Sequence, residues 1–156
     1  MSADREPADP IASQRGIAQL LRDAHRCYTR ALGARIASAG VTMGQWFFLR
    51  ALWEEDGLTQ RALSQRVGMM EPTTVTAIHG MERAGLVRRV RNPHDRRKVN
   101  IYLTDKGREL RGVLLPRAEE VDRQMVEGIG AGGLAAVSDV LGRIVANLGG
   151  TDDGET

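Results

Sequence analysis

Apolar residues recur at steps of three and four positions along most of this chain, which is the period of helices that bury one face. The pattern predicts a long first helix over residues 11–37, and Gly40 interrupts the periodic run after it. A second helix is expected over residues 45–54, followed by Gly57, which can take the positive φ of a helix stop. Both helices are therefore expected to pack through an apolar stripe.

Two short helical segments separated by a tight turn follow these helices. Thr59 is a good N-cap for the first segment, and Gly68 ends it. Pro72 suits the first turn of the second segment, because a proline has no N–H to satisfy there, and Gly85 is a natural C-cap. Two short helices joined by a glycine-containing turn are typical of a helix-turn-helix.

The period then shortens to two, which indicates a half-buried strand. Over residues 98–103 valine, isoleucine and leucine alternate with lysine, asparagine and tyrosine. The stretch "LVRRVR" supplies a partner strand, and Asn92-Pro93 with Asp95 has the composition of a turn. Thr104 is placed to cap a further helix that runs to about Gly128. The segment is therefore predicted to be a β-hairpin, or wing, that leads into a long helix.

These elements predict a mainly α protein: a winged helix-turn-helix with a small β-hairpin wing, flanked by N- and C-terminal dimerisation helices. A final helix is expected to carry the apolar residues Leu134, Val137, Leu141, Ile144, Val145 and Leu148. The first helix, the long helix and this final helix all have apolar stripes, more than one small core can cover, so a homodimer is expected. The expected parts are a disordered arm (1–10), a helical dimerisation region (11–38 and 104–148), a winged helix-turn-helix DNA-binding lobe (41–103) and a disordered acidic tail (149–156).

Charge is concentrated in the wing. Between Arg88 and Lys98 there are six basic residues and one acid, a net charge of +5, whereas the whole chain carries only +2. A charge that served solubility alone would be spread over the surface. The cluster therefore favours a polyanionic partner, and with the helix-turn-helix before it that partner is double-stranded DNA.

Composition narrows the remaining classes of function. The chain has 156 residues, 42% of them hydrophobic, and a single cysteine, which excludes an internal disulfide and fits a cytoplasmic protein. No run approaches 18 apolar residues, so no membrane span is expected. There is no glycine-rich phosphate loop and no Ser/His/Asp motif, and the three histidines lack metal-ligand spacing. The sequence thus predicts no enzyme, no cofactor and no metal site.

The stretches "LTQRALSQRVGM" and "MERAGLVRRVRNPHDRRKVNIYLTDKG", with the helices around them, resemble the MarR-type winged helix-turn-helix regulators of bacteria. The resemblance covers roughly Ile17 to Leu148. It implies a homodimeric DNA-binding repressor, less often an activator, of a pseudo-palindromic operator. Such proteins usually release DNA when a small molecule enters a crevice between the dimerisation helices and the DNA-binding lobe.

By the same resemblance the wing is the clearest contact with DNA. The arginine two positions after the wing aspartate, here Arg97, is implied to enter the minor groove, where a narrow groove concentrates negative potential. Asp95 would hold an arginine side chain by a charge-assisted pair, and Arg96 and Lys98 would meet phosphates. The predicted wing contacts are Arg91, Asp95, Arg96, Arg97 and Lys98. The alternative is a solvated charged hairpin.

The second helix of the helix-turn-helix is the predicted recognition helix. It should present Thr73, Val75, Thr76, His79, Gly80 and Arg83 to DNA. The family often has arginine in place of Thr76 and a basic or polar residue in place of Gly80, so fewer arginine contacts to guanine are expected. The predicted contacts with the DNA backbone are Gln60, Arg61 and Ser64.

Effector candidates mix aromatic and cationic side chains, which suits a small aromatic acid or its thioester. They are His25, Arg26, Tyr28, Trp46 and Trp53. Both tryptophans have a competing interpretation as core residues.

Cys27 could sense redox state, but it lies on or beside the apolar stripe, which favours an inert, buried thiol. A winged helix that binds DNA without sequence preference is the remaining alternative.

Overall fold

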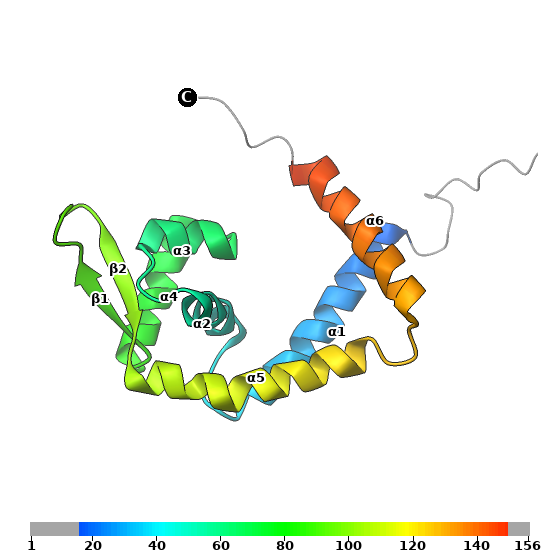
Figure 1. Cartoon of the computed structure of the whole chain (residues 1–156), viewed down its shortest axis with the longest axis horizontal. Helices are drawn as coiled ribbons and strands as arrows, with labels where there is room; N and C mark the ends of the chain where they lie inside the picture. The colour runs from blue at the N-terminus through cyan, green and yellow to red at the C-terminus, as the bar shows by residue number, and fades with distance from the viewer. Residues whose placement is uncertain (1–15, 150–156) are drawn as a thin grey trace, which may run out of the picture. The chain divides into compact units, whose positions relative to one another are not determined.

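The computed structural model describes residues 16–149, and within them the expected fold class is confirmed (Figure 1). The elements are α1 (Ile17–Ala37), α2 (Met43–Glu54), α3 (Gln60–Val67), α4 (Glu71–Arg83), β1 (Val87–Arg91), β2 (Val99–Leu103), α5 (Asp105–Met125) and α6 (Ala131–Gly149). The predicted disordered arm lies outside the described residues, as does the predicted tail beyond Gly149. The chain divides into two compact units between residues 121 and 122, and each is described by itself.

Helix α2 begins two residues earlier than its apolar period predicts. Thr42 precedes it, and its hydroxyl accepts a hydrogen bond from the Gln45 amide at 3.2 Å. The Gln45 side chain in turn accepts one from the Thr42 amide at 3.1 Å. This reciprocal capping box satisfies two backbone donors at the helix start, and therefore α2 includes Met43 and Gly44.

Replacing Thr42 with alanine should destabilise the fold by about 1 kcal/mol, because both bonds of the capping box are lost. Thr29→Ala is a matched control, since the Thr29 hydroxyl bonds only carbonyls of its own helix, those of His25 and Arg26. Urea unfolding followed by circular dichroism measures both free energies of unfolding. Equal losses in the two variants would show that the cap contributes nothing specific.

The helices of the helix-turn-helix begin and end at the predicted residues. The Thr59 hydroxyl accepts from the Ala62 amide at 3.1 Å, and Gly68 ends α3 in the left-handed conformation at φ 71°. Pro72 lies in the first turn of α4, and Gly85 after its end has φ 75°. Ser64 donates from its hydroxyl to the Met69 carbonyl at 2.5 Å, which fixes the turn between the two helices.

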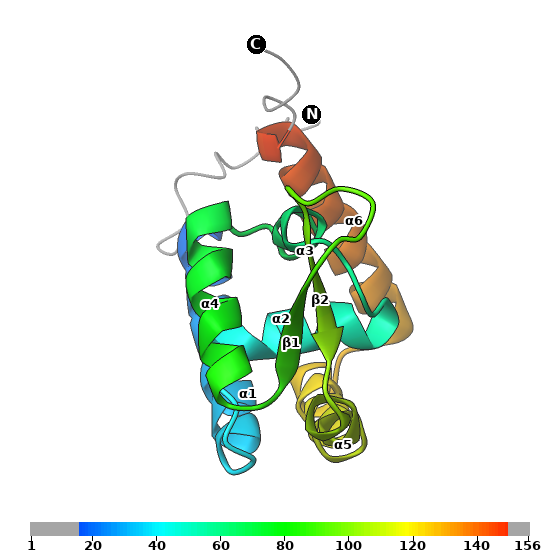
Figure 2. The same ribbon diagram turned by 90° about the vertical axis from the view of Figure 1, so that its left-hand side faces the viewer.

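Strand β2 is paired on both edges. It pairs antiparallel with β1, with Val87 opposite Leu103. On its other edge the Ile101 amide donates to the Leu58 carbonyl at 2.8 Å, and the Gly57 amide donates to the Ile101 carbonyl at 3.0 Å. The loop after α2 therefore fixes one side of the wing base, and Figure 2 shows the hairpin beside α4 with α5 at its base.

The core is centred on α2. Trp46, Phe48, Leu49 and Leu52 of this helix are almost fully buried. They pack with Leu32 and Ile36 of α1, Leu63 of α3, Ile78 and Met81 of α4, Ile101 and Leu103 of β2, and Leu114, Ala118 and Val121 of α5. The core thus joins the helix-turn-helix and the wing base into one lobe.

Large apolar side chains remain exposed on the remaining helices. On α1 they are Ile17, Leu20 and Leu21. On α6 they are Val137, Val140, Leu141, Val145 and Leu148, and no residue of α6 is buried. By length and composition alone α6 is long and apolar enough to cross a membrane, with 19 residues and a mean hydropathy of 1.2. Its Asp139–Arg143 ion pair and its exposed apolar residues equally fit a helix covered by another chain.

Candidate nucleic-acid interface

The tip of the wing is a closed turn. The Asn92 side-chain oxygen accepts from the amides of His94 and Asp95 at 2.8 and 3.2 Å. The Asn92 amide donates to the Lys98 carbonyl at 2.9 Å, and the Lys98 amide to the Asp95 carbonyl at 3.0 Å. Asparagine and aspartate side chains that bond the backbone in this way fix a turn, so the basic tip has a defined conformation.

Asp95 holds Arg97, which is the charge-assisted pair expected from the sequence. One carboxylate oxygen accepts from both the Arg97 amide at 3.0 Å and Nε at 3.1 Å, and the other accepts from Nη2 at 3.3 Å. The Arg97 side chain is nevertheless 90% exposed, whereas that of Asp95 is 29% exposed. The guanidinium is thereby oriented and still open to a partner.

These bonds make the wing turn pH-dependent at acid pH. The hydrogen bonds from Arg97, with a smaller contribution from the charge of Lys98, hold the pKa of Asp95 below that of an ordinary aspartate. Since the folded pKa is lowered, the contribution of the pair is present above the unfolded pKa of about 4 and is lost as pH falls through the folded pKa.

We expect the Asp95 carboxyl in NMR titration to have its midpoint below that of an ordinary aspartate, and the Arg97→Ala variant to shift it upward. An unchanged midpoint in that variant would mean that Arg97 does not stabilise the carboxylate.

A hollow of about 530 Å³ separates the wing tip from the helix-turn-helix. Its lining comes from α3, α4 and the wing: Thr59, Gln60, Arg61, Ala62, Gln65, Glu71, Asp95, Arg97, Lys98 and Val99. The structure thus brings the predicted backbone residues Gln60 and Arg61 next to the predicted wing residues. Glu71 also lines the hollow and was not predicted; its only signal in the sequence is its position as an acid in the first turn of α4.

Helix α4 turns one polar face outward. Thr74, Ile78 and Met81 are buried on the opposite face. The predicted contacts Thr73, Thr76, His79 and Arg83 are exposed, and Val75 and Gly80 are half-buried. The Thr76 hydroxyl donates to the Pro72 carbonyl at 3.1 Å, which leaves its oxygen to accept from a partner. Arg91 and Arg96 are likewise exposed on the wing.

Three predicted residues differ in exposure from what the sequence suggested. Ser64 is 3% exposed and its hydroxyl is used within the turn, so it is not available to a DNA backbone. Trp46 is 1% exposed, with its ring edge-on to Trp53 at 5.8 Å, and is a core residue instead of a ligand contact. Cys27, expected to be buried, is exposed in the single chain because it lies off the face that α1 packs on the core.

The other effector candidates differ in their surroundings. His25 and Arg26 are exposed on α1, where Arg26 pairs with Asp23 at 3.0 Å. Tyr28 is half-buried against the core. Trp53 donates from its indole nitrogen to the Gly107 carbonyl at 2.9 Å. Among the described residues, no group of three or more histidine, cysteine, aspartate or glutamate side chains is placed to hold a metal ion.

Comparison with known proteins matches this lobe to one family. A sequence model of the MarR family matches residues 41–99. The HTH-type transcriptional regulator TtmR of Methylorubrum extorquens is 37% identical over 89 residues, which cover 57% of this chain and 46% of TtmR. The chain covers 64% of the length of two further curated relatives. The family model thus matches the lobe that carries the hollow and α4.

Two longer matches extend beyond the lobe. The homoprotocatechuate degradative operon repressor of Escherichia coli is 29% identical over 125 residues, 80% of this chain and 82% of the repressor. The crystal structure of the transcriptional regulator PA3341 is 34% identical in sequence, with a TM-score of 0.75, and the match covers 85% of this chain and 98% of that one. The likeness therefore includes the flanking helices.

Proposed function

This chain belongs to the MarR family, and we propose that it is a cytoplasmic, homodimeric regulator of transcription that binds a specific DNA sequence. The observation that carries the proposal is Arg97, an exposed guanidinium oriented by Asp95 at the tip of a closed basic turn. A solvated charged hairpin would need no such orientation. DNA supplies a matching polyanion, and a narrow minor groove accepts a guanidinium.

Each element has a role in this proposal. Helix α4 enters the major groove, where Thr73, Thr76 and His79 face the base edges. The wing reaches the adjacent minor groove with Arg97. Arg61 and Lys98, which line the hollow between them, meet the phosphate backbone that separates the two grooves.

A second copy of the chain would cover the exposed apolar residues of α1 and α6. A two-fold dimer places two recognition helices on half-sites about one helical turn, ~34 Å, apart. The operator is therefore proposed to be pseudo-palindromic, and the regulator to act as a repressor when it occupies a promoter. The family and the repressor of homoprotocatechuate degradation among its relatives support this direction of control.

The effector is proposed to be a small aromatic acid. One relative is named as the repressor of the homoprotocatechuate degradative operon, and homoprotocatechuate is an aromatic acid. His25, Arg26 and Tyr28 remain the residues proposed for its site, and Trp46, which is 1% exposed, is assigned to the core in this proposal. Ligand binding would change the spacing of the two recognition helices and so release DNA.

The test compares a duplex from the gene's own upstream region with a scrambled duplex of equal length, across a salt series. Tight binding to the first alone, weakening with salt, supports a sequence-specific regulator. Equal binding to both supports an architectural protein instead. No binding to either at low salt contradicts the proposal. Release of the bound duplex by aromatic acids then tests the effector class.

The exposure of Cys27 keeps a redox-sensing regulator as a second candidate. Peroxide should then release DNA from the natural chain and not from Cys27→Ser. Release from both, or from neither, would contradict a role for this thiol.

A further inference from the structure

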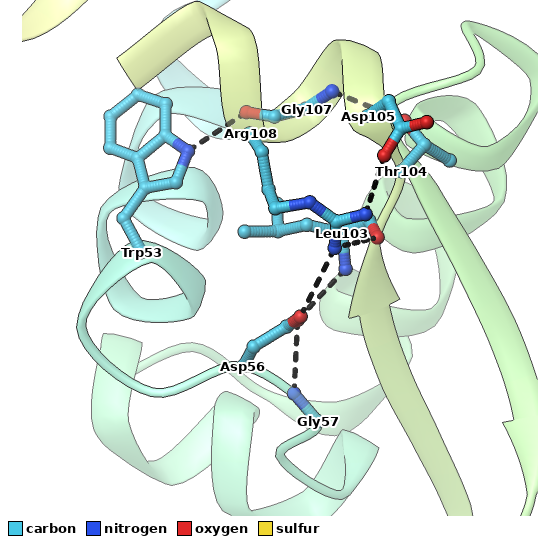
Figure 3. A network of polar contacts seen from close by, with 8 residues as sticks. All are labelled: Trp53, Asp56, Gly57, Leu103, Thr104, Asp105, Gly107 and Arg108. Atoms are coloured by element: carbon cyan, nitrogen blue, oxygen red, sulfur yellow. Dashed lines mark hydrogen bonds and ion pairs between the residues drawn. The ribbon is translucent and has the colours of Figure 1, made fainter. Parts of the chain in front are cut away.

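The first turn of α5 is held between the end of α2 and the end of the wing (Figure 3). Asp56, just after α2, accepts two backbone hydrogen bonds on one oxygen, from Leu103 at 2.8 Å and from Gly57 at 3.0 Å. Trp53 of α2 bonds the Gly107 carbonyl at 2.9 Å. Residues near 53–57 therefore fix both β2 and α5 at the point where one leads into the other.

Arg108 connects these parts. Its Nη1 donates to the carbonyl of Leu103, the last residue of β2, at 3.1 Å. Its Nη2 donates to Asp105, the first residue of α5, at 2.7 Å. Nη1 also lies 3.7 Å from the second oxygen of Asp56. One guanidinium thus spans the end of α2, the end of the wing and the start of α5.

The same turn of α5 is tied to the recognition helix. The Thr104 amide donates to the Leu86 carbonyl at 3.0 Å, and the Lys106 ammonium to the Ala84 carbonyl at 3.0 Å. Both carbonyls lie just beyond the end of α4. The wing therefore leaves from a junction that also carries the end of the helix proposed to read the bases.

We propose that Arg108 is a positioning residue for the wing, which sets the direction of β2 from this junction and so places Arg97 relative to α4. The inference rests on the DNA-binding function proposed above. At ~3.3 Å per residue the five residues of β2 span roughly 16 Å, so a small tilt at Leu103 becomes a larger displacement at the tip. A guanidinium that must enter a narrow groove tolerates little of that displacement.

Stability alone is a weak explanation of this arrangement. The Arg108 side chain is 53% exposed and its partner Asp105 is 91% exposed. Exposed ion pairs contribute little to the free energy of unfolding. Removing Arg108 should therefore change the free energy of DNA binding more than it changes the free energy of unfolding.

The experiment is a double-mutant cycle on the upstream duplex. Arg108→Ala should weaken binding about tenfold in the natural chain and less than about twofold in the Arg97→Ala background, because a displaced wing and a missing wing arginine remove the same contact. Asp56→Asn should act in the same direction, since it keeps the oxygen that accepts from Leu103 and removes the charge facing Arg108.

Arg111→Ala is the matched control, an exposed arginine on the next turn of α5. It removes the same charge and should leave binding nearly unchanged. Equal weakening by Arg108→Ala in both backgrounds, or an equal effect of Arg111→Ala, would overturn the proposal, because a direct contact or the loss of charge would then explain the result.

A measurement without DNA separates this inference from the function on which it rests. Hydrogen exchange of the wing amides over residues 88–99 should accelerate in Arg108→Ala and not in Arg111→Ala. Unchanged exchange would overturn the positioning role even if the natural chain binds DNA. Accelerated exchange in a chain that binds no duplex would leave the junction correct and the proposed function wrong.

Discussion

Arg97→Ala should weaken binding to the upstream duplex by about 2 kcal/mol, roughly thirtyfold in Kd. The side chain is 90% exposed, and its partner among the described residues is Asp95, so its removal should change the free energy of unfolding little. What is lost is a guanidinium that Asp95 already holds, so less side-chain entropy is lost on binding. Fluorescence anisotropy with a labelled duplex measures the change.

Two neighbouring substitutions make this result specific to the minor groove. Arg97→Lys keeps the charge and removes the planar fork that Asp95 holds, so it should fall between the natural chain and alanine. Arg96→Ala removes an adjacent exposed arginine, and its smaller loss should come with a salt slope reduced by about one. If Arg96→Ala and Arg97→Ala weaken binding equally, the wing would be a diffuse source of charge and the assignment of Arg97 would be wrong.

Local chemistry explains why the wing and the helix-turn-helix were predictable. Thr59, Gly68 and Pro72 mark helix ends by rules that need only neighbouring residues. Asn92 and Asp95 close the wing turn through backbone bonds two or three residues away. The pairing of Asp95 with Arg97 is equally local, so a sequence could indicate it.

The misplaced residues depend on contacts distant in the chain. The junction at the wing base joins Trp53 to Gly107, which lie 54 positions apart, and no periodic pattern signals it. The sequence leaves Trp46 either a ligand or a core role, and the structure buries it in a core built from several helices. Ser64 was expected to be a polar surface residue. Its hydroxyl donates instead to the Met69 carbonyl, whose position depends on the geometry of the turn.

The second large effect is expected at Gly107, buried in the first turn of α5. A Cβ there would meet the carbonyl oxygen of Leu86 and lie 3.1 Å from a methyl carbon of Leu103. Because the obstacle includes backbone, the chain cannot relieve it by rotating a side chain. Gly107→Ala should therefore destabilise the protein by at least about 2 kcal/mol, although alanine favours a helix over glycine by about 1 kcal/mol.

Gly112→Ala is the control with the opposite sign. It lies on the same helix, and a Cβ there meets nothing within 4 Å, so helix propensity alone should stabilise the fold by up to about 1 kcal/mol. Thermal unfolding should then show a lower melting temperature for Gly107→Ala and an equal or higher one for Gly112→Ala. Two shifts of the same sign and size would mean that α5 does not approach Leu86 closely, and the junction that places the wing would lose its structural basis.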